Sequence, residues 1–221
     1  MGDDAGGQVT ATDAIIDAMT LPTPVKRYTP QEYYALEHQA TYKSDYYNGE
    51  IFAMSGGTGR HSVIVVNVGG ELRQRLKGKP CGPYDSNMRL KISATGLRTY
   101  PDVSVYCGPV EYDPEDPEET TGLNATVVFD VLSKSTEGYD RGFKAENYRR
   151  VESLRAYVLV SQNAPHVEVY ARQANGTWAL TEARGLGEAI AIPGIDVELP
   201  LAEIYDRVTF PASPLSGSDD A

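Results

Sequence analysis

Residues Val127-Val128-Phe129-Asp130-Val131-Leu132 form an apolar run that a single carboxylate interrupts. Near-continuous apolar runs of this length are typical of strands buried on both faces of a sheet. An ionised carboxylate in such a strand is costly unless it meets a cation or several hydrogen-bond donors. Asp130 is therefore either a ligand of a metal ion or a structural residue, bonded to a backbone amide or an arginine.

A second carboxylate stands near the start of the strand predicted at residues 99–106. Asp102 lies there in the segment Tyr100-Pro101-Asp102-Val103-Ser104-Val105. Carboxylates on adjacent strands offer the hard oxygen ligands that Mg²⁺ or Mn²⁺ prefers. Such a metal polarises a phosphoryl group and lowers the pKa of an attacking water. The pair Asp102 and Asp130 therefore points to phosphodiester hydrolysis.

A lysine follows the apolar strand, in a helix predicted over residues 139–151. Lys144 shares a helical stripe with Tyr148 and Val151, which favours an inward orientation toward the sheet. It could also extend along the surface, or pair with Asp140 four residues earlier. In an inward position its ammonium group would stabilise negative charge at a reacting phosphate.

Two further polar residues belong to the region before these strands. Residues 42–55 are predicted to form a β-hairpin because Asn48-Gly49 is a strong two-residue turn signal. Glu50 follows that turn directly. His61 stands at the start of a helix predicted over residues 61–77, where it caps the helix or lies at the surface, or else belongs to a site.

The remaining pattern predicts an α/β protein, with a mixed sheet flanked by helices. Thr29, Pro30 and Glu32 form a capping-box signature at the start of a first helix. Strands are predicted near 83–92, 99–106, 124–132, 155–162, 165–171, 176–182 and 187–192, and a short helix near 201–205. The turn Asn175-Gly176 predicts a second hairpin.

One folded domain is expected at residues 27–210, between a flexible arm at 1–26 and a disordered tail at 211–221. A short helix could form across Asp13–Met19 within the arm. The segment Asp113–Glu119 is rich in acids and proline, and is predicted to be an exposed loop that does not pack.

Composition limits the class of protein. The net charge is -11, yet the acids concentrate in the two tails and in residues 111–119, so that the rest is close to neutral. Residues 60–98 hold eight bases and two acids, which neither proves nor excludes a DNA partner. No apolar run suits a membrane span, and no secretory signal is evident.

The chain has two cysteines, Cys81 and Cys107, outside any metal-binding spacing. A disulfide framework or a structural zinc site is therefore not expected. Cys107 is predicted to pack as a small apolar residue. The sequence favours a cytoplasmic protein with reduced thiols.

The sequence resembles the Uma2 family (DUF820) over about residues 28–210. The matching segments, in chain order, are Tyr47-Asn48-Gly49-Glu50-Ile51, Met54-Ser55-Gly56, His61 with Asn67, Pro101-Asp102-Val103, Val131-Leu132-Ser133-Lys134-Ser135-Thr136, Asp140-Arg141-Gly142-Phe143-Lys144 with Tyr148, Ser153-Leu154, Tyr157-Val158-Leu159-Val160 and Leu201-Ala202-Glu203-Ile204-Tyr205-Asp206. Many ordered matches with suitable gaps make this resemblance specific.

The resemblance implies a restriction-endonuclease-like core of the PD-(D/E)XK type, with flanking helices and extra β-hairpins. Asp102 would be the aspartate of the PD motif, and Asp130 would take the (D/E) position, where the family usually has Glu. The third position of that triplet is Leu132, so Lys144 in the next helix is the implied lysine. Glu50 would be an additional acid of the site, and His61 an auxiliary residue.

Three functional hypotheses follow. The first is an Mg²⁺- or Mn²⁺-dependent endonuclease acting on DNA, with Asp102, Asp130 and Glu50 as metal ligands and Lys144 as a catalytic residue. A homodimer is expected by analogy with other proteins of this fold. The second is a catalytically inactive binding or structural module that retains the fold. The third, a hydrolase that uses His61 and a serine, is supported by residue types alone.

Overall fold

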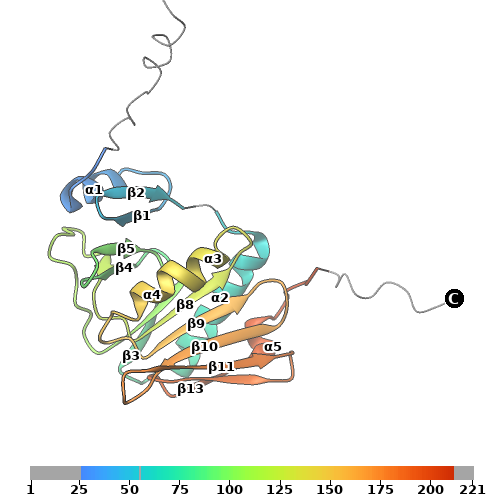
Figure 1. Ribbon diagram of the computed structural model, residues 1–221. Coiled ribbons are helices and arrows are strands. Elements are labelled where there is room, and N and C mark those ends of the chain that lie inside the picture. The colour runs from blue at the N-terminus through green and yellow to red at the C-terminus, as the bar shows by residue number, and fades with distance from the viewer. Residues whose placement is uncertain (1–25, 55, 212–221) are drawn as a thin grey trace, which may run out of the picture.

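The computed structural model describes residues 26–54 and 56–211 (Figure 1). Its helices are α1 (Pro30–Glu37), α2 (Gly59–Arg75), α3 (Glu137–Tyr139), the π-helical turn η2 (Asp140–Lys144), α4 (Ala145–Tyr148) and α5 (Leu201–Ile204). Its strands are β1 (Ser44–Tyr47), β2 (Glu50–Ala53), β3 (Cys81–Asp85), β4 (Arg89–Ile92), β5 (Leu97–Thr99), β6 (Val103–Cys107), β7 (Thr121–Gly122), β8 (Val127–Leu132), β9 (Ala156–Ser161), β10 (His166–Arg172), β11 (Trp178–Arg184), β12 (Ala189–Ile192) and β13 (Val197–Pro200). None of the described helices is long and apolar enough to span a bilayer.

A six-stranded sheet in the order β11-β10-β9-β8-β6-β3 forms the centre of the protein. The pair β8 and β9 is parallel, whereas the other neighbours in this sheet are antiparallel. Parallel neighbours require a crossover connection, and here α3, η2 and α4 supply it. The predicted mixed sheet with flanking helices is confirmed.

Both faces of this sheet are covered, which explains the apolar sequence of its central strand. One face packs against α2, whose predicted stripe Ile64, Val68, Leu72 and Leu76 is buried. The opposite face packs against α4, where Tyr148 meets Tyr157 of β9. All six residues of β8 are buried as a result, Asp130 among them.

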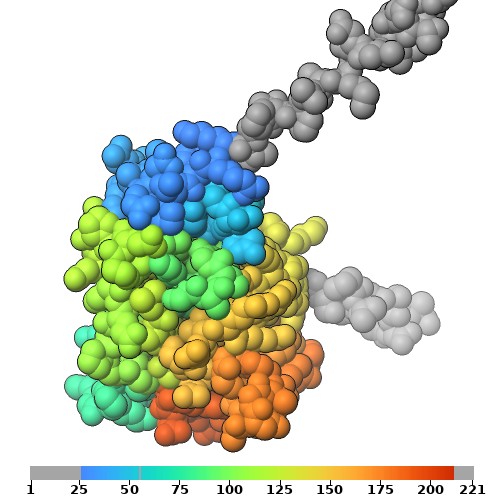
Figure 2. Space-filling view, turned by 60° about the vertical axis from the view of Figure 1, so that its left-hand side comes forward, coloured from blue at the N-terminus to red at the C-terminus, as the bar shows by residue number. Residues whose placement is uncertain are grey.

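The N-terminal segment contributes α1 and the hairpin β1–β2, which joins β5, β4 and β7 in a second, five-stranded sheet in the order β2-β1-β5-β4-β7. The predicted capping box of α1 is present, with Glu32 N donating to the Thr29 hydroxyl and Thr29 N donating to the Glu32 carboxylate. The predicted β1–β2 turn is present, and Asn48 and Gly49 both take the positive φ that it requires. Figure 2 shows this segment capping one end of the molecule, above the segments that follow it in the sequence.

The acidic segment Asp113–Glu119 is a loop with four exposed residues, as predicted, but it packs through two of its acids, so the expectation that it does not pack is wrong. Asp113 and Asp116 are 1% and 3% exposed. Asp116 accepts from Arg89 at 3.0 Å, and Asp113 lies 3.3 Å from Arg98. Both arginines are buried on the small sheet, so the acids neutralise cations that would otherwise be unpaired in the interior.

Cys81 and Cys107 form a disulfide, which corrects the predictions of free thiols and of Cys107 as a simple packing residue. The two residues are direct partners in the antiparallel register of β3 and β6. This pairing brings their Cα atoms to 3.9 Å, although 26 residues separate them in the sequence.

Several element boundaries also differ from the predictions. The strand predicted at 83–92 is two strands in different sheets, because a turn intervenes in which Asn87 N donates to the Asp85 carboxylate. The strand predicted at 99–106 likewise belongs partly to β5 and partly to β6. β13 was not predicted, and the helix proposed across Asp13–Met19 lies outside the described residues.

Candidate active site

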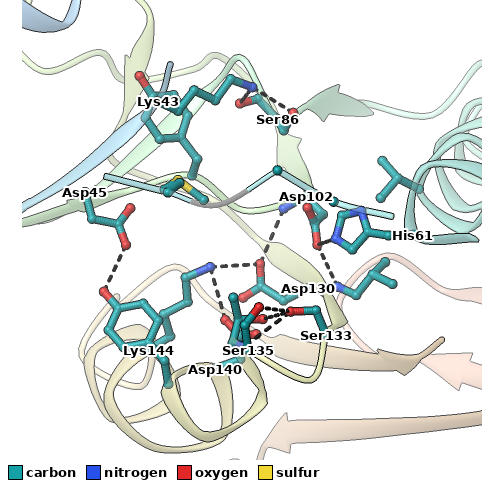
Figure 3. Close-up of a pocket in the computed structure, with 18 of the residues that line it drawn as sticks. Lys43, Asp45, His61, Ser86, Asp102, Asp130, Ser133, Ser135, Asp140 and Lys144 are labelled. Atoms are coloured by element: carbon teal, nitrogen blue, oxygen red, sulfur yellow. Dashed lines mark hydrogen bonds and ion pairs between the residues drawn. The ribbon is translucent and has the colours of Figure 1, made fainter. Parts of the chain in front are cut away.

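A cavity of about 1130 Å³ lies where the N-terminal sheet meets the central sheet. Its walls come from the hairpin β1–β2, the start of α2, the residues around Asp102, the end of β8 and the helical crossover. Four carboxylates and one lysine converge at this cavity: Asp45, Asp102, Asp130, Asp140 and Lys144 (Figure 3). The structure therefore brings four of the five predicted site residues together, namely Asp102, Asp130, Lys144 and the auxiliary His61.

Asp130 lies on the floor of the cavity and is 2% exposed. Its Oδ1 accepts from Lys144 Nζ at 3.3 Å and from Asp102 N at 3.4 Å, while its Oδ2 accepts from the Tyr157 hydroxyl at 2.8 Å. Burial raises the pKa of Asp130 to about 7, against the lowering effect of Lys144. Asp140 and Asp102 raise that pKa further, because their negative charges oppose ionisation.

Asp102 stands immediately before β6 and reaches the same floor. Its Oδ2 accepts a hydrogen bond of 2.7 Å from Val131 N, on the neighbouring strand. His61 Nε2 lies 3.2 Å from the same oxygen. Burial opposes protonation of His61, yet the hydrogen bond and charge of Asp102 raise its pKa. His61 therefore faces the cavity beside Asp102, and the Thr58 hydroxyl, which accepts from His61 N, caps α2.

Lys144 enters the cavity from the π-helical turn. Its Nζ lies 3.3 Å from both Asp130 Oδ1 and Asp140 Oδ1, and the residue is 4% exposed. The predicted alternatives of inward orientation and pairing with Asp140 are therefore both realised. The π-helical turn places Asp140 and Lys144 at the cavity, while Arg141 reaches Glu168 on β10, outside the cavity. Burial alone would lower the pKa of Lys144, but the surrounding carboxylates, Asp130 first, raise it.

Asp45 is a site residue that sequence reasoning missed. It lies on β1, is 4% exposed, and accepts a hydrogen bond of 2.9 Å from the Tyr139 hydroxyl through Oδ2. Its Oδ1 is buried and has no hydrogen-bond partner among the described residues. Burial raises the pKa of Asp45, and the charge of Lys144 counteracts this. The sequence did carry a signal for this residue. Asp45 is an acid beside two tyrosines in a short strand, much as Asp130 is an acid within an apolar strand.

Glu50, in contrast, is not among the residues that face the cavity. It pairs across the hairpin with Tyr47, at the turn end of β2. Its carboxylate lies 3.1 Å from Arg27, whose side chain is 56% exposed. The structure therefore does not bring Glu50 to the other predicted residues, although its cross-strand partner Tyr47 lines the cavity.

The donor set of the cavity fits a hard divalent cation. Within the described part of the chain, four carboxylates line it against two lysines and His61, so negative charge is in excess. One oxygen of Asp45 lacks a partner there, and an ionised buried carboxylate requires one. Carboxylate oxygens are the ligands that Mg²⁺ and Mn²⁺ prefer.

Comparison with known proteins identifies the family. The Uma2 family model, described as "putative restriction endonuclease", matches residues 30–202. The chain belongs to the Uma2 family.

Its relatives agree with this assignment. The chain is 32% identical over 188 residues to the uncharacterised protein slr1290 of Synechocystis sp., covering 85% of this chain and 96% of that protein. It is 30% identical over 167 residues to sll1609 of the same organism, covering 76% and 93%. A crystal structure from Anabaena variabilis, described as a putative nuclease belonging to DUF820, superposes with a TM-score of 0.64. That match covers 80% of this chain and 97% of the other at 15% identity, so it shows a shared fold.

A second group of possible metal ligands lies outside the cavity of this Uma2 protein. Ligand atoms of His166, Glu168 and Glu182 lie within 4.8 Å of one another. Arg141 binds both oxygens of Glu168, at 2.6 and 2.8 Å, and Arg184 donates to Glu182 at 3.0 Å. Arginines already balance these acids, so the cavity is the better candidate for a metal site.

Proposed function

We propose that this Uma2 protein is an Mg²⁺- or Mn²⁺-dependent endonuclease that hydrolyses phosphodiester bonds in DNA. The observation that carries the proposal is the meeting of Asp45, Asp102, Asp130 and Lys144 in one cavity. The descriptions of the family and of the structural neighbour as nucleases support it.

Each residue has a role that its surroundings suit. Asp102, Asp130 and Asp45 would hold the cation, which supplies Lewis-acid polarisation of the phosphate when bound. Lys144 places a positive charge beside the carboxylates, where it would offset charge that builds on a reacting phosphate. His61, hydrogen-bonded to Asp102, orients that carboxylate and can hold or release a proton at Nε2.

An inactive nuclease-fold binding module is the second candidate, and one observation favours it. Both oxygens of Asp130 already accept hydrogen bonds from protein groups. A cation at this carboxylate must therefore displace or share existing contacts. If this module were the true function, folded protein would show no metal affinity at the cavity.

The proposal is tested by incubating plasmid and single-stranded DNA with purified protein and Mg²⁺, Mn²⁺ or EDTA. Cleavage that requires the metal is expected, together with a metal-induced rise in the melting temperature. Asp102→Ala protein, purified in parallel, controls for a contaminating nuclease and should not cut. Folded wild-type protein that neither cuts DNA nor responds to metal would favour the binding module.

The contribution of the hairpin is tested with Asp45→Asn. This change removes the buried charge and keeps the shape. Loss of a group that only supports a metal ligand typically costs roughly tenfold to 100-fold, so loss of a ligand should lower cleavage by at least about tenfold. The metal-induced rise in melting temperature should shrink with it, because one donor to the cation is gone.

Glu50→Gln is the matched control, since it changes an acid on the same hairpin that lies outside the cavity. Its cleavage rate should stay within about twofold of wild type, because its exposed pairing with Arg27 contributes little. Loss of activity in Glu50→Gln with a normal Asp45→Asn protein would reverse these assignments and restore the sequence-based role of Glu50.

A further inference from the structure

The mouth of the cavity is rich in exposed apolar side chains. Nine large apolar side chains are exposed among the described residues, and four of them line this one cavity. They are Tyr42, Phe52, Val66 and Tyr139, with exposed fractions of 62%, 49%, 71% and 36%. They come from four separate segments, so the fold gathers them at one place. Exposed aromatic rings beside a reaction centre offer stacking surfaces for bases.

Both lysines that line the cavity, in contrast, already have hydrogen-bond or ion-pair partners within the protein. Lys43 donates to the Ser86 carbonyl at 2.6 Å and to its hydroxyl at 2.9 Å. Lys144 is held by Asp130 and Asp140. Tight binding of duplex DNA depends on many Lys and Arg contacts to phosphates. No arginine of the described ranges lines this cavity, so its affinity must come largely from contacts to bases.

The depth of the reactive groups points the same way. Asp130 and Lys144 are 2% and 4% exposed, at the floor between the two sheets. A flexible single strand can bend into this hollow and bring a phosphate to the floor, whereas a duplex, with a persistence length of about 150 base pairs, bends much less readily.

We propose that the cavity takes single-stranded DNA, with successive bases stacked on Tyr42 and Phe52 while a phosphate reaches the floor. Single-stranded DNA would be the substrate of the proposed nuclease site, so the catalytic part of this inference depends on the proposed function. Asp45 and Phe52 are cross-strand partners in the hairpin, so the same element supplies a floor carboxylate and a stacking ring.

The test measures binding apart from cleavage. A fluorescein-labelled oligothymidylate of about 15 nucleotides is titrated with protein in EDTA, and anisotropy is compared with the same strand annealed to its complement. Wild-type protein should bind the single strand more tightly. Tyr42→Ala and Phe52→Ala should each weaken that binding by about 5-fold to 150-fold, the range for loss of one stacked base.

Leu180→Ala is the control, because Leu180 is 50% exposed on β11 and does not line the cavity. It should bind the oligonucleotide like wild type. Equal or tighter binding of the duplex, no binding of either form, or unchanged affinity in both aromatic variants would overturn the inference. Single-strand binding lost in the aromatic variants, without any cleavage in Mg²⁺ or Mn²⁺, would support the inference and refute hydrolysis. Duplex cleavage that both variants retain would refute single-strand stacking and leave the nuclease intact.

Discussion

Lys144→Ala protein should cleave DNA roughly 10²-fold to 10³-fold more slowly than wild type, the range found when one preorganised electrostatic group is removed. Lys144 is the ammonium group at the floor of the cavity, 3.3 Å from Asp130 and from Asp140. Its removal takes away the positive charge that a reacting phosphate would meet. The rate is measured with saturating Mg²⁺ or Mn²⁺ on the substrate that wild type cuts.

A structural effect must be separated from this loss, since removing Lys144 leaves buried carboxylates without their cation. The melting temperature of the variant, with and without metal, provides that separation. Metal should stabilise Lys144→Ala at least as strongly as wild type, because the carboxylate ligands remain and the competing ammonium group is gone.

Arg141→Ala is the matched control for the lysine. Arg141 lies in the same π-helical turn but binds Glu137 and Glu168 instead of facing the cavity. Its loss should leave the cleavage rate within about threefold, because neither Glu137 nor Glu168 lines the cavity. A folded Lys144→Ala protein that cuts at the wild-type rate would remove Lys144 from the catalytic group.

Short-range sequence patterns were sufficient to predict those elements whose structure depends on residues close together in the chain. The capping box at Thr29, the turn at Asn48-Gly49 and the apolar stripe of α2 each depend on residues close in sequence. The buried acid of β8 was predictable for the same reason, because the apolar residues around it are its immediate neighbours. The stripe of α2 and the strand β8 belong to the central sheet and one of its faces, whereas the capping box and the turn belong to the N-terminal segment.

What could not be predicted depends on contacts between distant residues. Asp113 and Asp116 are acids in a proline-rich segment, and their burial follows only from arginines on strands β4 and β5. The disulfide follows from the register of β3 against β6. Asp45 and Glu50 lie on one hairpin, and only the packing of that hairpin on the crossover helix decides which acid meets the cavity.

Asp116→Ala should lower the free energy of unfolding by about 3–5 kcal/mol, the cost typical of removing one partner from a buried ion pair. Arg89 is 2% exposed, donates to Asp116 at 3.0 Å, and has its guanidinium 4.9 Å from the Tyr34 ring centre. Without Asp116 that guanidinium stays buried with its charge uncompensated. Urea unfolding at neutral pH gives the difference, provided that the slope with denaturant is unchanged.

The pH dependence gives an independent check on the same pair. Burial opposes ionisation of Asp116, but the Thr121 and Thr120 hydroxyls and Arg89 outweigh it and lower the pKa of its carboxyl. A lowered pKa in the folded state means that the contribution to stability is complete above pH about 4, the unfolded value. It is lost as the pH falls through the lower, folded value. Wild type should therefore lose part of its advantage over Asp116→Ala in acid.

Glu118→Gln is the control for Asp116, because its side chain is 59% exposed while it also contacts His38. It should change the free energy of unfolding by less than about 1 kcal/mol. The double variant Arg89→Met/Asp116→Leu should recover much of the lost stability, since it removes the unpaired charge itself. An Asp116→Ala protein as stable as Glu118→Gln would mean that water or His38 satisfies Arg89. The small sheet that carries Asp45 would then be held mainly by its apolar contacts.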